Sequence, residues 1–192
     1  MNFLGHLFFS HNDHRLMHAN LFGDFVKGKD LSMYPEIVQE GITLHRNIDS
    51  YIDHHPVILE LLHVLYKPLP KVAGIAVDLY FDHILAKRWN EYHTQSLDKF
   101  VNEFYSAPIE DRKYFNDQYL FMIDKMKEKN WLYQYQFKHG LFKACNGVSN
   151  RISFPNALNT AHSVFDDYEK QITEAFEAYM NEAILKFYKS TI

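Results

Sequence analysis

The near absence of residues and runs that interrupt helices is the pattern that most constrains this chain. Only 7 glycines and 6 prolines occur among its 192 residues, and apolar and polar residues rarely alternate as they do along a half-buried strand. The chain also lacks internal repeats and low-complexity linkers. We therefore predict an all-α fold, a helical bundle in a single domain that covers 1–192.

Breaks in the apolar pattern divide the chain into predicted helices. The first two cover about 2–9 and 13–25, and a third begins at Pro35 and ends before Pro56, because the residue before a proline avoids the helical conformation. A fourth follows over about 56–66. The stretch 71–92 is apolar on nearly every side, which predicts a central helix buried by its neighbours. Further helices are predicted over 96–108, 111–130, 131–145 and about 159–188.

Composition excludes several classes of protein. Hydrophobic residues make up 47% of the chain, enough for one substantial core, and no apolar run approaches the ~20 residues of a membrane span. The N-terminal stretch lacks the basic region and cleavage site of a signal peptide. Cys145 is the single cysteine, which excludes an intramolecular disulfide and favours a soluble, cytoplasmic protein. A formal charge of -4 argues against a dedicated nucleic-acid binder.

Polar groups of the metal-binding type gather in the stretch QEGITLHRNIDSYIDHHPV, residues 39–57. Residues four apart lie nearly above one another on a helix, so His45, Asp49 and Asp53 share one face. The predicted central helix carries Asp78 and Asp82 at the same spacing. Imidazole nitrogen and carboxylate oxygen suit a divalent cation, and facing helices can supply both.

Two more polar groups lie in aromatic surroundings, His6 in NFLGHLFF and Asp24 in NLFGDFV. An ionised carboxylate buried among apolar residues is destabilising unless it is paired or bound to a metal. Taken singly, each of these residues has a plain structural explanation, such as a satisfied core histidine or a salt-bridged aspartate. The joint pattern of His6, Asp24, His45, Asp78 and Asp82 favours a metal site.

Other polar residues have structural alternatives. Asp49 and Asp53 can pair with Arg46 or with lysines on a solvated face. We expect His54 and His55, which precede a proline, to cap a helix end or to be exposed. The histidines without a comparable partner pattern are interpreted as structural: His11, His14, His18, His63, His93, His139 and His162.

Five blocks of the sequence together resemble, in order, the acyl carrier protein phosphodiesterases, also called acyl carrier protein hydrolases. The blocks are MNFLGHLFFS, ANLFGDFVKG, GITLHRNIDSYIDHHPV, GIAVDLYFDHILAKRW and RISFPNAL. The likeness runs from the first residue to about Trp89 and resumes over about 140–158, whereas about 91–130 carries little of it. That family is similar to a divergent branch of the HD-domain metal phosphohydrolases, so the resemblance implies an HD-domain-like helical bundle.

The resemblance also implies where a metal would be held. The usual HD pattern has a histidine, then an adjacent His-Asp pair, then a later aspartate. His6 takes the place of the first histidine and Asp24 that of the aspartate in the pair, but Gly23 stands where the paired histidine would be. A ligand is therefore missing, and we expect His45 to supply it.

The final aspartate of the pattern falls at Asp78 or Asp82. Manganese is the cation that the resemblance favours, with magnesium or iron as alternatives. A bound cation would lower the pKa of its water and neutralise charge on phosphodiester oxygens. The predicted metal ligands are His6, Asp24, His45 and Asp78.

The activity implied by the resemblance is hydrolysis of holo-acyl carrier protein, which releases apo-carrier and free 4'-phosphopantetheine. Asp49 and Asp82 are candidates to orient or deprotonate the attacking water, or to support the histidines. His83 is a candidate to protonate the leaving serine oxygen or to act as a further ligand. Arg46 can bind a phosphate oxygen through its forked donors. Residues predicted to line the substrate entrance are Asn2, Lys27, Arg151 and Asn156, with salt bridging as the alternative for the two cations.

A strongly acidic carrier implies a basic docking face on this protein, whose effect would weaken with salt. Two other functions are compatible with the same residues: an HD-type hydrolase of a nucleotide or other small phosphoester, and a non-catalytic helical protein that binds an acidic partner. None of these features specifies an oligomeric state. Candidate docking residues are Lys27, Lys29, Lys67, Lys71, Lys87 and Arg88.

Overall fold

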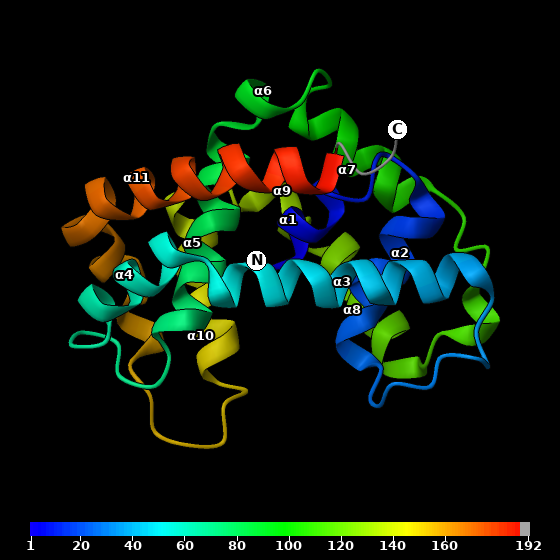
Figure 1. The fold of residues 1–192 in the computed structure, drawn as a ribbon, viewed down its shortest axis with the longest axis horizontal. Coiled ribbons are helices and arrows are strands. Elements are labelled where there is room, and N and C mark those ends of the chain that lie inside the picture. The colour runs from blue at the N-terminus through cyan, green and yellow to red at the C-terminus, as the bar shows by residue number, and fades with distance from the viewer. Residues whose placement is uncertain (189–192) are drawn as a thin grey trace.

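The computed structural model describes residues 1–188, which form helices joined by short connections (Figure 1). No β-strand occurs within that range, so the predicted all-α fold is confirmed. The α-helices are α1 (Phe3–Phe8), α2 (His14–Phe22), α3 (Glu36–His54), α4 (Pro56–Leu65), α5 (Ala73–Lys87), α6 (Trp89–Tyr92), α7 (Leu97–Ser106), α8 (Asp117–Glu128), α9 (Trp131–Gln134), α10 (Lys138–Ser149) and α11 (Ala161–Tyr188). Short 3-10 helices are η1 (Gly23–Phe25), η2 (Arg112–Tyr114) and η3 (Leu158–Thr160).

The predicted helices correspond to observed ones, with four corrections. The predicted helix 111–130 is the 3-10 helix η2 followed by α8, which begins at Asp117. The predicted helix 131–145 is two helices, α9 and α10, because the chain turns back so closely that a Cβ at Gly140 would lie 1.8 Å from the carbonyl oxygen of Gln134. The predicted central helix ends at Lys87, and Trp89 begins α6. The last helix is kinked at Tyr168, where φ is -119° and ψ is 15°.

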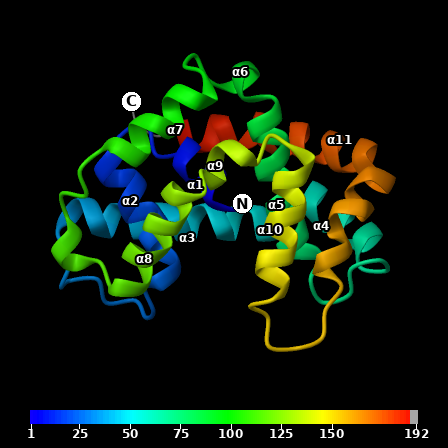
Figure 2. The ribbon, with the colours of Figure 1, turned by 180° about the vertical axis from the view of Figure 1, so that it is seen from behind.

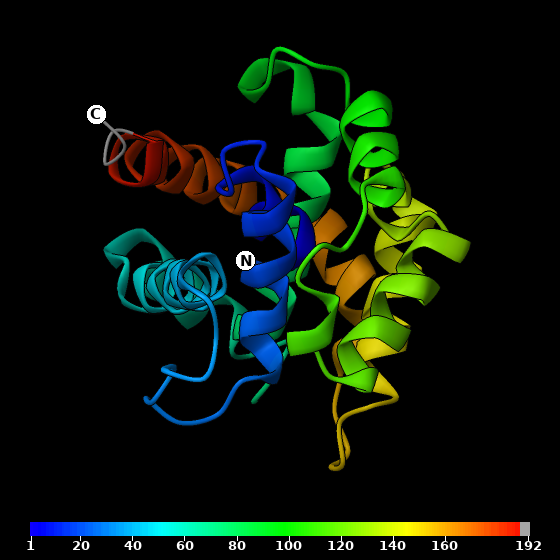
Figure 3. The same cartoon turned by 90° about the vertical axis from the view of Figure 1, so that its right-hand side faces the viewer.

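Seen along α3, the helices lie in layers (Figure 3). One layer contains α3 and α11, a middle layer contains α1, α2 and α5, and the other side contains α7 to α10. Seen from behind, α8 lies in front of α2 and α3, α9 lies beside α1, and α10 lies in front of α5 (Figure 2). The short helix α1 therefore lies inside the molecule, packed against both α2 and α5.

Small residues bring α2 and α3 close together. A Cβ at Gly41 would lie 2.3 Å from the Cβ of Ala19 and 2.7 Å from the backbone nitrogen of Asn20. Any larger side chain at position 41 would push the two helices apart, because protein interiors are packed without spare space. This contact holds α3 against the middle layer, so its next turns lie over α1.

The central helix α5 is apolar on nearly every side, as predicted, and packs against α1, α4, α10 and α11. Asp82 is the one fully buried carboxylate of this helix. It accepts hydrogen bonds from the backbone nitrogens of Leu4 at 2.7 Å and Gly5 at 3.0 Å. Asn2, the residue before α1, makes no such side-chain bond. A helix start leaves its first N–H groups unpaired, so Asp82 caps α1 from a different helix.

The length and apolarity that a membrane crossing requires are not combined in any helix of residues 1–188.

Aromatic packing surrounds His18 on α2. Its ring lies 4.8 Å from that of Phe104, its Nδ1 is 2.7 Å from the hydroxyl of Tyr119, and only 3% of the residue is exposed. Burial disfavours the imidazolium and lowers the pKa of His18 from 6.5 to about 4. The histidine is thus a structural residue, as the sequence indicated.

We predict that His18 makes the protein less stable in mild acid. Between pH 6.5 and about 4 the unfolded chain binds a proton at this position that the folded chain does not, so the free energy of unfolding falls as the pH falls. The loss approaches about 3 kcal/mol. His18→Gln, which keeps a hydrogen-bonding group for Tyr119, should flatten this part of the profile in urea unfolding from pH 7 to pH 4. Identical slopes for both proteins would contradict the prediction.

Candidate metal centre

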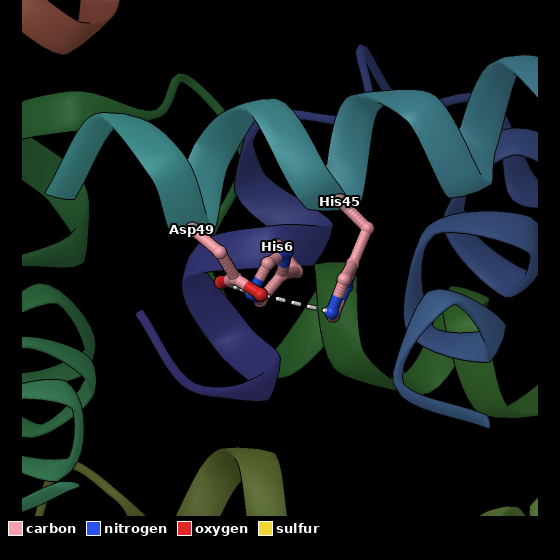
Figure 4. A group of neighbouring side chains, drawn as sticks. All are labelled: His6, His45 and Asp49. Atoms are coloured by element: carbon pink, nitrogen blue, oxygen red, sulfur yellow. Dashed lines mark ion pairs between the residues drawn. The ribbon is translucent and has the colours of Figure 1, made fainter. Parts of the chain in front are cut away.

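His6, His45 and Asp49 lie together between α1 and α3 (Figure 4). His45 and Asp49 project from successive turns of α3 toward α1, which carries His6. The two imidazole rings are stacked, with centroids 4.2 Å apart and planes 18° apart. Both Nε2 atoms point to the carboxylate of Asp49. His45 and Asp49, four residues apart, therefore lie on one face of α3, as predicted.

The separations of the donor atoms suit a small divalent cation. Asp49 Oδ1 is 3.2 Å from His6 Nε2, and Asp49 Oδ2 is 3.1 Å from His45 Nε2. Asp24, in η1, adds a further oxygen 3.2 Å from His45 Nε2. In an octahedral site with bonds of about 2.1 Å, neighbouring ligand atoms lie about 3 Å apart. Two imidazole nitrogens and two carboxylates are also ligands that manganese, magnesium and iron accept.

Asn20 on α2 orients His6, and the sequence reasoning missed it. Its Oδ1 lies 2.9 Å from His6 Nδ1, while its Nδ2 donates to the carbonyl oxygen of His6 at 3.0 Å and to Ser10 Oγ at 3.0 Å. These two bonds identify the Nδ2 side of the Asn20 amide, so Asn20 Oδ1 must accept a hydrogen bond from His6 Nδ1–H. His6 Nε2 is then unprotonated, with its lone pair toward Asp49. The sequence feature that could have indicated Asn20 was its position, four residues before Asp24.

Gly23 provides the space that His45 occupies. A Cβ at this glycine would lie 2.5 Å from Cγ and 2.6 Å from Cβ of His45. A side chain at position 23 and the imidazole of His45 therefore exclude one another. That His45 stands in for a histidine missing at position 23 stays a prediction.

Hydrogen bonding sets the charge of the group. Burial opposes protonation of His45, but its hydrogen bonds to Asp24 and Asp49 outweigh that effect and raise its pKa to about 9. Burial dominates at His6 and lowers the pKa of that ring, although the nearby Asp49 carboxylate opposes this effect. For Asp49 itself, burial is outweighed by the hydrogen bond from His45 and by the nearby His6, which hold the pKa of the carboxyl below its ordinary value. The carboxylates thus attract one positive charge to the place where their donor atoms meet.

The carboxylates of the group reach the surface while the imidazoles do not. The side chains of His6 and His45 are 4% and 6% exposed, whereas those of Asp49 and Asp24 are 44% and 55% exposed. Asp24 was expected among buried aromatic residues, but η1 turns it outward at the end of α2. The group is accordingly open on its carboxylate side.

Asp78, predicted as a ligand, lies outside the group of metal-binding atoms found within residues 1–188. Its carboxylate lies 2.9 Å from the amino group of Met1 and is 39% exposed, so the expectation of a buried carboxylate is wrong. Asp82 is buried as expected, but its oxygens accept the two backbone hydrogen bonds that cap α1. Burial outweighs those bonds and raises the pKa of Asp82 to about 7.

The other predicted catalytic and phosphate-binding residues have structural contacts. His83 is buried, with Nδ1 2.6 Å from the carbonyl oxygen of Tyr135, and its ring does not join the metal-binding group. Arg46 follows His45 on α3, yet its Nη2 donates to the carbonyl oxygens of Val26 at 3.2 Å and Gly28 at 2.8 Å. It therefore ties α3 to the loop after η1.

The predicted entrance residues are dispersed. Asn2 and Arg151 line one cavity, described below. Lys27 is exposed in the loop that follows Asp24. Asn156 bonds Ser149 through both its amide atoms, which closes the connection after α10. Their roles in substrate binding stay predictions.

Two expectations about surface residues need correction. His55 is only 3% exposed and lies against the rings of Tyr51 and Tyr179, although it does separate α3 from α4 as expected of a capping residue. Among the predicted docking cations, Lys87 pairs with Glu169 at 3.4 Å, and Arg88 pairs with acidic residues of α6 and α11. These two positive charges are neutralised within the protein.

Comparison with known proteins gives a consistent result. The model of the family described as "Acyl carrier protein phosphodiesterase" matches residues 1–183. A protein of Salmonella paratyphi A named acyl carrier protein phosphodiesterase is 29% identical over 177 residues, which cover 92% of each chain. Proteins with the same name from Salmonella agona and Salmonella newport are 28% identical over the same share. No solved structure matches significantly, so the HD-domain-like arrangement stays a prediction.

We predict that Gly23→Ala destabilises the protein through its contact with His45. The added methyl group would overlap the imidazole, and overpacking of this kind costs about 1–3 kcal/mol in the free energy of unfolding. Gly74→Ala is the matched control, because a Cβ at Gly74 has no atom within 4 Å. Urea unfolding should show a loss for the first variant and no loss for the second. Equal stability of the two variants would contradict the steric explanation.

Proposed function

The chain belongs to the acyl carrier protein phosphodiesterase family, and we propose that it hydrolyses the phosphodiester of holo-acyl carrier protein. In this reaction a water oxygen forms a bond to phosphorus while the bond from phosphorus to the carrier's serine oxygen breaks. One proton of the water is transferred to the serine oxygen. The products are apo-carrier and 4'-phosphopantetheine, and no oxidant or second substrate is required.

The observation that carries this proposal is the convergence of His6 Nε2, His45 Nε2 and the carboxylate of Asp49, with the carboxylate of Asp24 beside His45. We assign these four residues as the ligands of a divalent cation, with manganese favoured and magnesium or iron as alternatives. Such a cation would act as a Lewis acid on the phosphodiester and lower the pKa of the attacking water. The buried imidazoles give the site a rigid base, and Asn20 keeps the His6 ring in the ligating tautomer.

The exposure of the carboxylates suits a macromolecular substrate. The bond to be broken lies on a folded protein, so a deeply enclosed site would exclude it. Asp49 and Asp24 are about half exposed, at 44% and 55%, while the imidazoles behind them are buried. Lys27 and Lys29 lie exposed in the loop after Asp24, where an acidic carrier would contact them.

Asp53 is a better-placed proton donor than His83. It lies one helical turn beyond Asp49 on α3 and is exposed. Burial raises the pKa of this carboxyl, and the negative charges of Asp78 and Asp49 raise it further. Because Asp53 lies one turn from the metal-binding group and is open to solvent, we assign it to protonate the leaving serine oxygen.

The reaction can be tested with purified protein, Mn²⁺ and holo-acyl carrier protein, by weighing the carrier in a mass spectrometer. We expect the carrier to lose the mass of the phosphopantetheine group. Asp49→Asn should lower both kcat/KM and bound manganese by more than about 100-fold, because loss of a ligand exceeds the roughly 10–100-fold effect of an outer-shell residue. Asp167→Asn, on the exposed side of α11, is the matched control.

An unchanged carrier mass in the presence of an active reference enzyme would reject the proposal. Faster cleavage of free nucleotides than of holo-carrier would instead identify a nucleotide phosphohydrolase. A protein that binds neither metal nor substrate, and whose stability is unaffected by Asp49→Asn, would fit a non-catalytic helical partner.

The assignment of Asp53 has its own test. Asp53→Asn should reduce kcat on holo-carrier by about 100-fold or more, since general acid catalysis contributes roughly that factor. Bound manganese, measured after dialysis, should equal that of the wild type, because Asp53 is not assigned as a ligand. If kcat is retained, another group or solvent supplies the proton.

A further inference from the structure

A cavity of about 670 Å³ lies between α1, α5, α9 and α10, apart from the metal-binding group. We call it the α10 cavity. Its apolar wall comes from Phe3, Leu79, Trp131 and Val148. This volume falls in the range of pockets that bind small molecules, and none of the metal-binding residues lines it.

Uncharged polar groups are placed among these apolar residues. Asn2 Nδ2 donates to the hydroxyl of Tyr135 at 3.2 Å, and Gln134 contributes a second amide to the wall. Asn2 is half-buried, so its amide retains hydrogen-bonding capacity toward the cavity. A wall of this kind matches a chain that alternates amide bonds with aliphatic groups.

The rim of the α10 cavity is basic. Lys129, Lys143 and Arg151 line it, and none of the three forms an ion pair within residues 1–188. Arg151 instead donates from Nε to the carbonyl oxygen of Gly147 at 3.2 Å. These positive charges differ from those of Lys87 and Arg88, which are neutralised by acidic neighbours.

Helix α1 connects the metal-binding group with the α10 cavity, because His6 lies one turn beyond Phe3, which lines the cavity. Its wall residue Leu79 follows Asp78, whose carboxylate binds the Met1 amino group beside α1. A shallower hollow of about 290 Å³ shares three of its wall residues and extends to Phe25, the residue after Asp24. The hollow therefore extends from the cavity toward η1, the segment that carries Asp24.

We propose that the α10 cavity binds the pantetheine portion of the substrate while the phosphodiester lies at the metal-binding group. This inference rests on the proposed function. Pantetheine is an uncharged chain with two amide bonds, a dimethyl-substituted carbon and a thiol end, which matches the mixed wall of the cavity. The carrier, which is bonded to the phosphate, then lies on the carboxylate side of the metal-binding group, beside the exposed Lys27 and Lys29.

Gly147 offers a way to fill the cavity. It lines the wall, and a Cβ added there has no atom within 4 Å, so a side chain can extend without overlap. Gly74 on α5 is equally open but does not line the cavity. Gly147→Leu and Gly74→Leu are therefore a matched pair, with the same change in volume and in helix propensity.

Binding can be measured without catalysis, by titrating pantetheine and following tryptophan emission. The chain has two tryptophans, of which Trp131 lines the cavity and Trp89 is buried elsewhere. Wild type and Gly74→Leu should show a saturable change that Trp131→Phe abolishes. In Gly147→Leu the Kd should rise at least about 10-fold. Tyr135→Phe, which only removes a hydroxyl, should raise it about 2- to 10-fold.

Kinetics give an independent readout. Gly147→Leu should lower the ratio of kcat/KM for holo-carrier to that for bis(4-nitrophenyl) phosphate, which has no arm, by at least about 10-fold. Gly74→Leu should leave this ratio unchanged. If the wild type cleaves holo-carrier but pantetheine gives no saturable signal and Gly147→Leu keeps the wild-type ratio, the inference is overturned. If pantetheine binds as expected but holo-carrier is not cleaved, the proposed function fails while the binding site stands.

Discussion

The structure depends on one buried carboxylate. Asp82 accepts the backbone N–H groups of Leu4 and Gly5, and this pair of bonds holds the first turn of α1 against α5 in the middle of the molecule. An isolated helix as short as α1 is not stable in water, so its position comes entirely from such contacts. His6 directly follows the capped residues Leu4 and Gly5. Asp82 therefore positions the imidazole of His6 through the backbone of α1.

Two close approaches complete the arrangement around α1. Gly41 lets α3 pack onto α2, and Gly23 leaves room for the imidazole of His45. The side chains of His45 and Asp49 then point from α3 toward His6, and Asn20 on α2 fixes the tautomer of His6. The donor atoms come from three segments of the chain, α1, η1 and α3, so the geometry of the group depends on how these segments pack together.

The middle layer separates two chemical environments. On the α3 side of α1 lie carboxylates and imidazoles suited to a cation and a phosphodiester, whereas the α9 and α10 side has an apolar cavity with amide groups and a basic rim. Hydrolysis of a phosphodiester that joins a protein to a long amide-linked arm requires both environments close together. The proposed arm site is therefore the complement of the proposed metal centre.

The sequence by itself determined the helical fold, because helix periodicity and the scarcity of glycine and proline act locally. It also determined that His45 and Asp49 share a face, since residues four apart on a helix always do. The tertiary structure alone decided which side chains meet across helices. Spacing treated Asp78 and Asp82 alike, yet Asp78 pairs with the amino group of Met1 and Asp82 caps α1. Periodicity specifies the face of a helix, whereas the element that packs against that face is specified only by the fold.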